Sequence, residues 1–192
     1  MLARSGVAAW GAFGVLSCLA PGMPAAAGNA PMTTVAIERN GEVFEIEATS
    51  RVRAGVDVAW AVLTDYEGYV NFVPGMTHSL RLGERPLLIE QRGEFGVLFF
   101  RKQVYATLEV EQDEPAEIRF RALAGNMRRL DTRIRLRVDG DHVVLAYQSV
   151  IEPDFWVPPV IGTPIVRAAI HRKLDAVAGE IERRAGDMNA GQ

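Results

Sequence analysis

The sequence predicts an α+β fold, in which a curved antiparallel sheet of about six to seven strands wraps around one long C-terminal helix. Three observations predict it. Apolar and polar residues alternate through most of residues 43–151, which is the period of half-buried strands. Turn signals such as Asp139-Gly140-Asp141 separate these stretches, and tight turns join antiparallel neighbours. After Thr163 the period becomes that of a helix.

Residues 1–27 have the pattern of an export signal. Arg4 supplies a positive charge, the run from Val7 to Leu16 is apolar, and Ala25-Ala26-Ala27 is a small-residue cleavage pattern. The apolar run is too short to span a bilayer. We therefore expect the segment to be removed and the protein to be exported to the periplasm.

The rest of the chain is expected to form one domain over residues 28–186, followed by a flexible tail over residues 187–192. An alternative for the N-terminus is a lipoprotein anchored through Cys18, because Val15-Leu16-Ser17-Cys18 resembles a lipobox. Cleavage after Ala27 would leave a protein without thiols, since Cys18 is the only cysteine. Disulfides and cysteine-ligated metals are then excluded.

Composition and motifs narrow the function classes. The net charge of −3 argues against an electrostatic nucleic-acid binder. The sequence contains no metal-binding box, phosphate loop, dinucleotide fingerprint or GxSxG motif, so no metal or cofactor is expected. No residue pattern identifies a protein partner, and transient contact with a membrane stays open.

The first elements after the signal are a hairpin and two short helices. Val43 to Val52 alternates strictly, and Asn40-Gly41 is a turn signal that can pair Thr33 to Arg39 with it. Asp57 is expected to cap the first helix, and Pro74 is expected to end the second.

Further strands are expected between residues 77 and 154. Their predicted ranges are Leu80–Leu82, Leu87–Arg92, Val97–Val110, Ile118–Leu123, Leu130–Val138 and Val143–Ile151. The turns between them are expected at residues 83–86, 93–96, 113–115, 125–126 and 139–141. In the last strand both faces are apolar, and we favour Tyr147 over Gln148 as the residue that points inward.

The C-terminal segment is predicted to be a helix from Thr163-Pro164 to a stop at Gly186. Its apolar stripe has helical spacing, with Lys173 among the residues expected on the surface; the stripe consists of Val166, Ile170, Leu174, Val177 and Ile181. A sheet with one apolar face and a helix with one apolar stripe must cover each other. One helix need not fill a curved sheet, and this leaves room for a ligand.

Two segments resemble a known family. VDVAWAVLTDYEGYVNFVPGM at residues 56–76 is similar to the START-like (helix-grip) superfamily, in its polyketide cyclase/dehydrase and coenzyme Q-binding branch. VVLAYQSVIEPDFWVPPVIG at residues 143–162 looks like the last strand and the Pro-rich lead to the final helix in that family. One departure is Leu130-Asp131-Thr132, where related chains often carry a Gly and a Trp. The resemblance implies the helix-grip fold and says little about the ligand.

The favoured function is the binding or carriage of a hydrophobic small molecule, such as a lipid or quinone, between the sheet and the C-terminal helix. Residues near turns and prolines are expected to form the mouth of the cavity. The predicted ligand-binding residues are Phe72, Val73, Met76, Phe120, Tyr147, Trp156, Ile165 and Ala169.

Two alternatives belong to other classes. A cyclase or dehydratase could use the same cavity, but His78, His142 and His171 have no partner at a diagnostic spacing, and we expect them at the surface. A protein-interaction module could use the strand face that carries Arg133, Arg135 and Arg137, although a strictly alternating charged face is usually just solvated.

Overall fold

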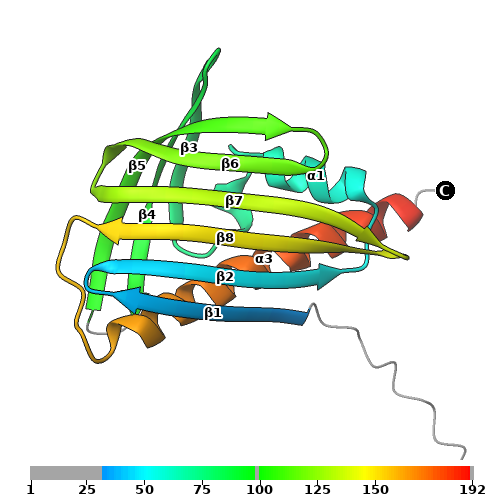
Figure 1. The fold of residues 1–192 in the computed structure, drawn as a ribbon. Coiled ribbons are helices and arrows are strands. Elements are labelled where there is room, and N and C mark those ends of the chain that lie inside the picture. Colours follow the sequence, from blue (N-terminus) through cyan, green and yellow to red (C-terminus); the bar gives the residue numbers. More distant parts are fainter. Residues whose placement is uncertain (1–31, 98–99, 191–192) are drawn as a thin grey trace, which may run out of the picture.

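The computed structural model describes residues 32–97 and 100–190, which fold into the predicted α+β unit (Figure 1). The expected export signal, residues 1–27, lies outside the described residues. The strands are β1 (Met32–Asn40), β2 (Val43–Val52), β3 (Met76–Glu84), β4 (Leu87–Val97), β5 (Phe100–Asp113), β6 (Glu117–Gly125), β7 (Met127–Asp139) and β8 (His142–Pro153). The helices are α1 (Val56–Thr64), α2 (Tyr69–Phe72) and α3 (Gly162–Ala190).

All strands of the described residues join one antiparallel sheet in the order β1-β2-β8-β7-β6-β5-β4-β3. After β2 the chain forms α1 and α2, starts again at the far edge with β3, and returns strand by strand to β8. The described residues contain eight strands rather than six to seven, because β1 pairs with β2 along its whole length.

The sheet curves around α3, and β4 and β5 run across the direction of β7 and β8 (Figure 1). Irregular pairing contributes to this curvature. The register shifts between Thr107 and Leu108 in β5, and Gly125 (φ 130°) lies against the backbone of Tyr105. The pairing of β6 with β7 ends at Arg121 and Asp131, after which β6 stays with β5 and β7 stays with β8.

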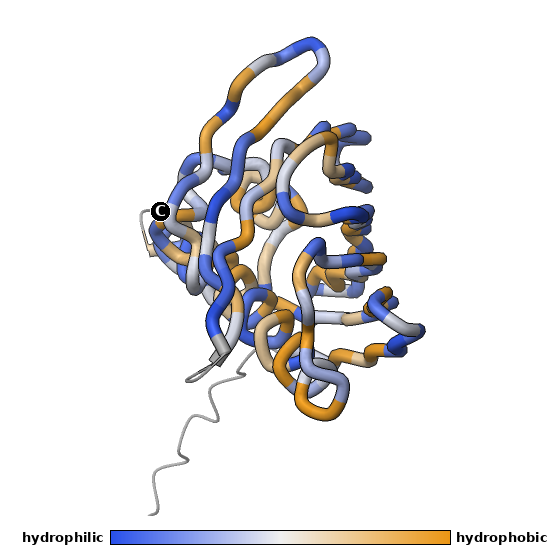
Figure 2. Tube along the Cα trace, turned by 90° about the vertical axis from the view of Figure 1, so that its left-hand side faces the viewer, coloured by the Kyte–Doolittle hydropathy of each residue, from blue (hydrophilic) through white to orange (hydrophobic). Residues whose placement is uncertain are grey.

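The alternating pattern correctly predicted which faces are buried. In β2, Phe44 and Ile46 are buried while Glu45 and Glu47 are exposed. Figure 2 shows the same alternation of hydrophobic and hydrophilic residues along the β3–β4 hairpin, which protrudes from the body. In β8, Tyr147 is buried and Gln148 is exposed, as favoured above.

One predicted turn and the strand start that follows it differ from the structure. The expected turn at residues 93–96 is wrong, because β4 continues to Val97 and its Glu94 N–H donates to the carbonyl of Gly75 at 2.8 Å. The next strand begins at Phe100 instead of Val97. Glycines suggested a turn, but Gly93 is needed because its backbone lies close to Gly75, where a Cβ would meet the Gly75 oxygen at 2.6 Å.

The ends of two helices also differ from expectation. Gly55, not Asp57, is the N-cap of α1, and Asp57 lies in the first turn, where its charge still favours the helix dipole. The expected stop of α3 at Gly186 is wrong, because the helix continues to Ala190. Within the described residues, no helix has an apolar stretch long enough to cross a bilayer.

A clasp of charged residues joins the end of α1 to the last turns of α3. The Arg184 guanidinium donates to Asp65 and to Glu180, both at 2.7 Å. Arg183 donates to Glu180 at 2.8 Å and 2.7 Å. Asp65 also accepts a bond from the Gly68 N–H at 3.2 Å, so one aspartate ends α1 and holds α3.

Acid should weaken this clasp. Hydrogen bonds from Arg183 and Arg184 hold the pKa of Glu180 at about 2, below its usual value. A carboxylate with a lowered folded-state pKa stabilises the fold above its unfolded pKa of ~4.3, and this stability is lost as the pH falls towards 2. We expect Glu180→Gln to lower the free energy of unfolding by about 1 kcal/mol at neutral pH, because both arginines are partly solvated. Urea denaturation should show that the difference in free energy of unfolding between the natural protein and Glu180→Gln shrinks below pH 4. A difference that does not change with pH would contradict the lowered pKa of Glu180.

Candidate functional site

A cavity of about 250 Å³ lies between the inner face of the sheet and α3. Its walls come from the strands β4 to β8, from α3, and from the segment that follows α1. The volume is just below the ~300–1,000 Å³ that is typical of small-molecule pockets. Side chains therefore do not fill the space under the helix, which is the condition that a ligand-binding function needs.

The sheet wall is built by the inward-facing residues of successive strands. Leu108, Phe120 and Ile134 come from β5, β6 and β7, and Tyr147 comes from β8. Each has a relative exposure of 8% or less. Alternate residues of a strand point to the same face of the sheet, so these side chains lie on one face. The wall is apolar because the residues at those alternate positions are mostly apolar.

The helix wall follows the spacing of α3. Val166, Ala169, Ile170, Leu174 and Val177 line the cavity, as expected for residues on one helical face. Lys173 lines it as well and is half-buried. The expectation that Lys173 lies elsewhere on the surface is therefore wrong.

The segment after α1 closes another side of the cavity. The Tyr69 hydroxyl donates to the carbonyl of Leu63 at 2.6 Å, which satisfies an acceptor near the end of α1. Burial raises the pKa of Tyr69, so the phenol stays protonated. Gly75 has φ 80°, and a Cβ there would meet the Glu94 oxygen at 2.6 Å, so the Pro74-Gly75 turn needs its glycine.

Of the predicted ligand-binding residues, Val73, Met76, Phe120, Tyr147 and Ala169 line this cavity together. Their contact with a ligand stays a prediction.

The other three predicted residues do not line the cavity. Phe72 packs edge-on against Tyr69, with ring centroids 5.5 Å apart. Trp156 is 65% exposed, and Ile165 is buried outside the cavity lining. Trp156 lies in the loop before α3, and Ile165 lies one residue before Val166, the first residue of α3 that lines the cavity.

The loop between β8 and α3 contributes one side chain to the cavity and is anchored elsewhere. Phe155 lines the cavity, whereas Val157 is completely buried in the core. Arg39 of β1 donates to the carbonyls of Val157 at 3.1 Å and Pro158 at 3.0 Å. Proline-rich backbone has few donors of its own, so one arginine satisfies carbonyls and fixes the loop.

The histidines of the chain lie away from the cavity lining. His78 of β3 is 3.3 Å from Glu90, and His171 of α3 is 2.6 Å from Asp175. His142 lies in the β7–β8 hairpin beside Asp141. His171 is exposed and the other two are partly exposed, and none of the three is among the described residues that line the cavity.

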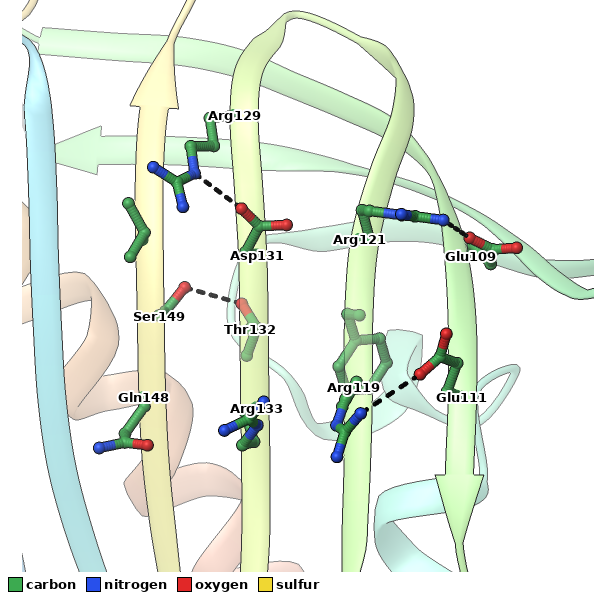
Figure 3. A pocket seen from close by; sticks show the side chains of 12 residues that line it. Glu109, Glu111, Arg119, Arg121, Arg129, Asp131, Thr132, Arg133, Gln148 and Ser149 are labelled. Carbon is green, nitrogen blue, oxygen red and sulfur yellow. Dashed lines mark hydrogen bonds and ion pairs between the residues drawn. The ribbon is translucent and has the colours of Figure 1, made fainter.

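A second, shallow hollow of about 410 Å³ lies on the outer face of β5 to β8, next to the point where the pairing of β6 with β7 ends (Figure 3). Charged side chains of the outer face surround it, and most of them are paired. Arg121 pairs with Glu109, and Arg119 lies 3.6 Å from Glu111. Arg129 and Asp131 are 2.7 Å apart on β7.

Arg133 and Arg135, two of the three arginines considered for a protein-interaction surface, share this pairing. Glu117 of β6 accepts from Arg135 at 2.6 Å and lies 3.5 Å from Arg133. It also pairs with Arg119. These arginines lower the pKa of Glu117, and Arg135 makes the largest contribution. The strand face is therefore a lattice of opposite charges instead of a uniformly basic patch.

Comparisons with known proteins agree with this architecture. A family model described as polyketide cyclase / dehydrase and lipid transport matches residues 52–178. No curated protein matches the chain.

Solved structures match at low identity and show the fold. A START superfamily protein from Mycobacterium smegmatis has a TM-score of 0.57 and 18% identity, over 75% of this chain and 98% of that one. The Zhui aromatase/cyclase from a Streptomyces species has a TM-score of 0.60 and 19% identity, over 74% and 95%. A STAR-related lipid transfer protein from Xanthomonas axonopodis has a TM-score of 0.58 and 16% identity, over 77% and 98%.

Proposed function

Because the chain belongs to the polyketide cyclase/dehydrase and lipid transport family, we propose that it binds an apolar small molecule between the sheet and α3. The observation that carries the proposal is the unfilled cavity, whose walls are mainly aliphatic and aromatic side chains. Removing apolar surface from water contributes about 2.5 kcal/mol per ~100 Å². Part of that gain offsets the cost of immobilising the ligand.

The modest volume of the cavity limits the ligand. About 250 Å³ accommodates a compact ring system or a medium-length chain better than a two-chain lipid. We therefore propose that the ligand is a quinone, bound by its ring, or a simple amphiphile with a single chain. The resemblance of residues 56–76 to the coenzyme Q-binding branch supports including quinones in this proposal.

We propose that binding takes place in the periplasm, on the basis of the export pattern in residues 1–27. Fractionation of the natural host, followed by mass measurement of the mature N-terminus, tests this. A periplasmic protein that begins just after Ala27 is the expected result, and a mature N-terminus at a lipidated Cys18 would support the anchored alternative.

The experiment for the binding function is native mass spectrometry of protein purified from its own host. We expect an added mass that organic solvent extracts and that identifies the bound molecule. Protein without any added mass that also converts a small aromatic or polyketide-like test substrate would instead favour catalysis of the cyclase or dehydratase type.

A further inference from the structure

Lys173 is the feature of the cavity that apolar binding alone does not explain. It lies on α3 within the stripe formed by Ala169, Ile170 and Val177, and it is half-buried. A lysine at this position brings an ammonium group to a wall that is otherwise mainly aliphatic and aromatic. Moving the ammonium out of water against this surface is unfavourable unless an anion offsets the lost hydration.

The surrounding sequence does not provide that pair. Positions three and four residues from Lys173 hold Ala169, Ile170, Ala176 and Val177, so an intrahelical ion pair cannot form. Elsewhere on α3 such pairs do form, for example between Glu180 and Arg184. Among the described residues, no carboxylate lies within ion-pair distance of Lys173.

The other charged residues at the cavity already have partners. Arg92 is 3.0 Å from Glu90, and Glu94 is 3.6 Å from Arg101. Arg92 and Glu94 line the cavity but are exposed residues at alternate positions of β4, and their charges are already paired. Within the described lining, Lys173 is therefore the cation that is available to a ligand.

Tyr147 supplies a second polar group. Its side chain is 4% exposed and lines the cavity from β8. Among the described residues, its hydroxyl has no hydrogen-bond partner, unlike the hydroxyls of Tyr66 and Tyr69. The hydroxyl oxygen is not among the fully buried side-chain atoms that lack a partner, so it is accessible and can donate to an oxygen of a ligand in the cavity.

We propose that the ligand is an amphiphile with an anionic head, a carboxylate or phosphate, whose charge pairs with Lys173 while its apolar part occupies the cavity. This proposal rests on the binding function proposed above and names the class of ligand. The Tyr147 hydroxyl donates to an oxygen of the same molecule. An anionic head gains the attraction between opposite charges in addition to a hydrogen bond from the ammonium, whereas an alcohol gains only the hydrogen bond, so the head group decides affinity among ligands with equal chains.

Calorimetric titration of the full-length protein with decanoate, decyl phosphate and decan-1-ol tests this. The three probes share one alkyl chain and differ in the head. We expect at least one anion to bind about 10- to 100-fold more tightly than the alcohol. Whichever of decanoate and decyl phosphate binds more tightly identifies the head group as a carboxylate or a phosphate.

Variants assign the preference to one side chain. Lys173→Met should bind decan-1-ol at least as well as the natural protein and lose the preference for the anion. Lys173→Arg should keep it. Arg172→Met is the matched control, because Arg172 is the neighbouring exposed cation of α3 and does not line the cavity. Tyr147→Phe should reduce anion affinity by a smaller factor, about tenfold or less.

The outcomes separate the two proposals. Equal affinity for the anions and the alcohol in the natural protein, or a preference that survives in Lys173→Met, would overturn the anionic-head proposal while leaving apolar binding intact. That result would mean that the ammonium simply reaches solvent along the cavity wall. Failure of all three probes to bind would contradict both proposals.

Discussion

Replacing Ala169 with tryptophan is expected to abolish uptake of an apolar ligand while the protein stays folded. Ala169 lies on the cavity-facing stripe of α3 and is half-buried. An indole at this position would occupy much of a cavity of about 250 Å³. Extra volume in a filled core costs about 1–3 kcal/mol, but here the existing hollow accepts most of it.

The measurement is a titration with N-phenylnaphthylamine, a neutral fluorescent probe of apolar sites, together with urea denaturation of both proteins. We expect the affinity of Ala169→Trp to fall at least about 100-fold, since the probe loses its apolar contacts. Gly179→Trp is the matched control, because Gly179 is exposed on the same helix and nothing lies within 4 Å of an added Cβ. Unchanged affinity in a folded Ala169→Trp protein would show that the probe binds somewhere other than beneath α3.

Much of the fold was predictable because it depends on local periodicity. Alternation identified the buried faces of β2, β5 and β7, and helical spacing identified the core residues of α3. Tyr147 was favoured as the inward residue of β8 for the same reason, and the structure confirms it. Each of these predictions needs only the position of a residue within its own element.

The errors arose where a distant segment decides the local conformation. Gly93 and Gly96 suggested a turn, yet β4 continues because it pairs with β5 as far as Val97, and Glu94 also bonds to Gly75 just before β3. Such a contact depends on the register of two strands, which residue type does not reveal. Glycine serves both turns and close backbone contacts, and the sequence alone cannot separate these uses.

The site was predictable in part. The stripe on α3 was recognised, but Lys173 was assigned to the surface because it is charged, although it is four residues from Ala169 and from Val177. Spacing was the signal that could have identified it. The partners of the arginines on β7 were harder to predict, because Glu117 comes from the neighbouring strand and its register was unknown.

Truncating Tyr66 to alanine is expected to be the most destabilising single change considered for this chain. Tyr66 is completely buried between α1 and α2. Its ring meets those of Tyr69 at 6.0 Å and Phe120 at 6.2 Å, both edge-to-face. Removing a large buried aromatic side chain costs about 3–5 kcal/mol, out of the ~5–15 kcal/mol that stabilises a typical domain.

Tyr66→Phe separates packing from hydrogen bonding. The Tyr66 hydroxyl accepts a bond from the Gln112 side chain at 2.6 Å, and Gln112 is exposed enough to bond to water instead. We therefore expect Tyr66→Phe to cost only about 1 kcal/mol in urea denaturation. A loss of about 1 kcal/mol or less for Tyr66→Ala as well would show that the ring does not hold the α1–α2 segment on the sheet.

Because Phe120 both contacts Tyr66 and lines the cavity, Tyr66→Ala should weaken ligand binding even under conditions in which the protein remains folded. Tyr66→Phe, which keeps that contact, should bind normally.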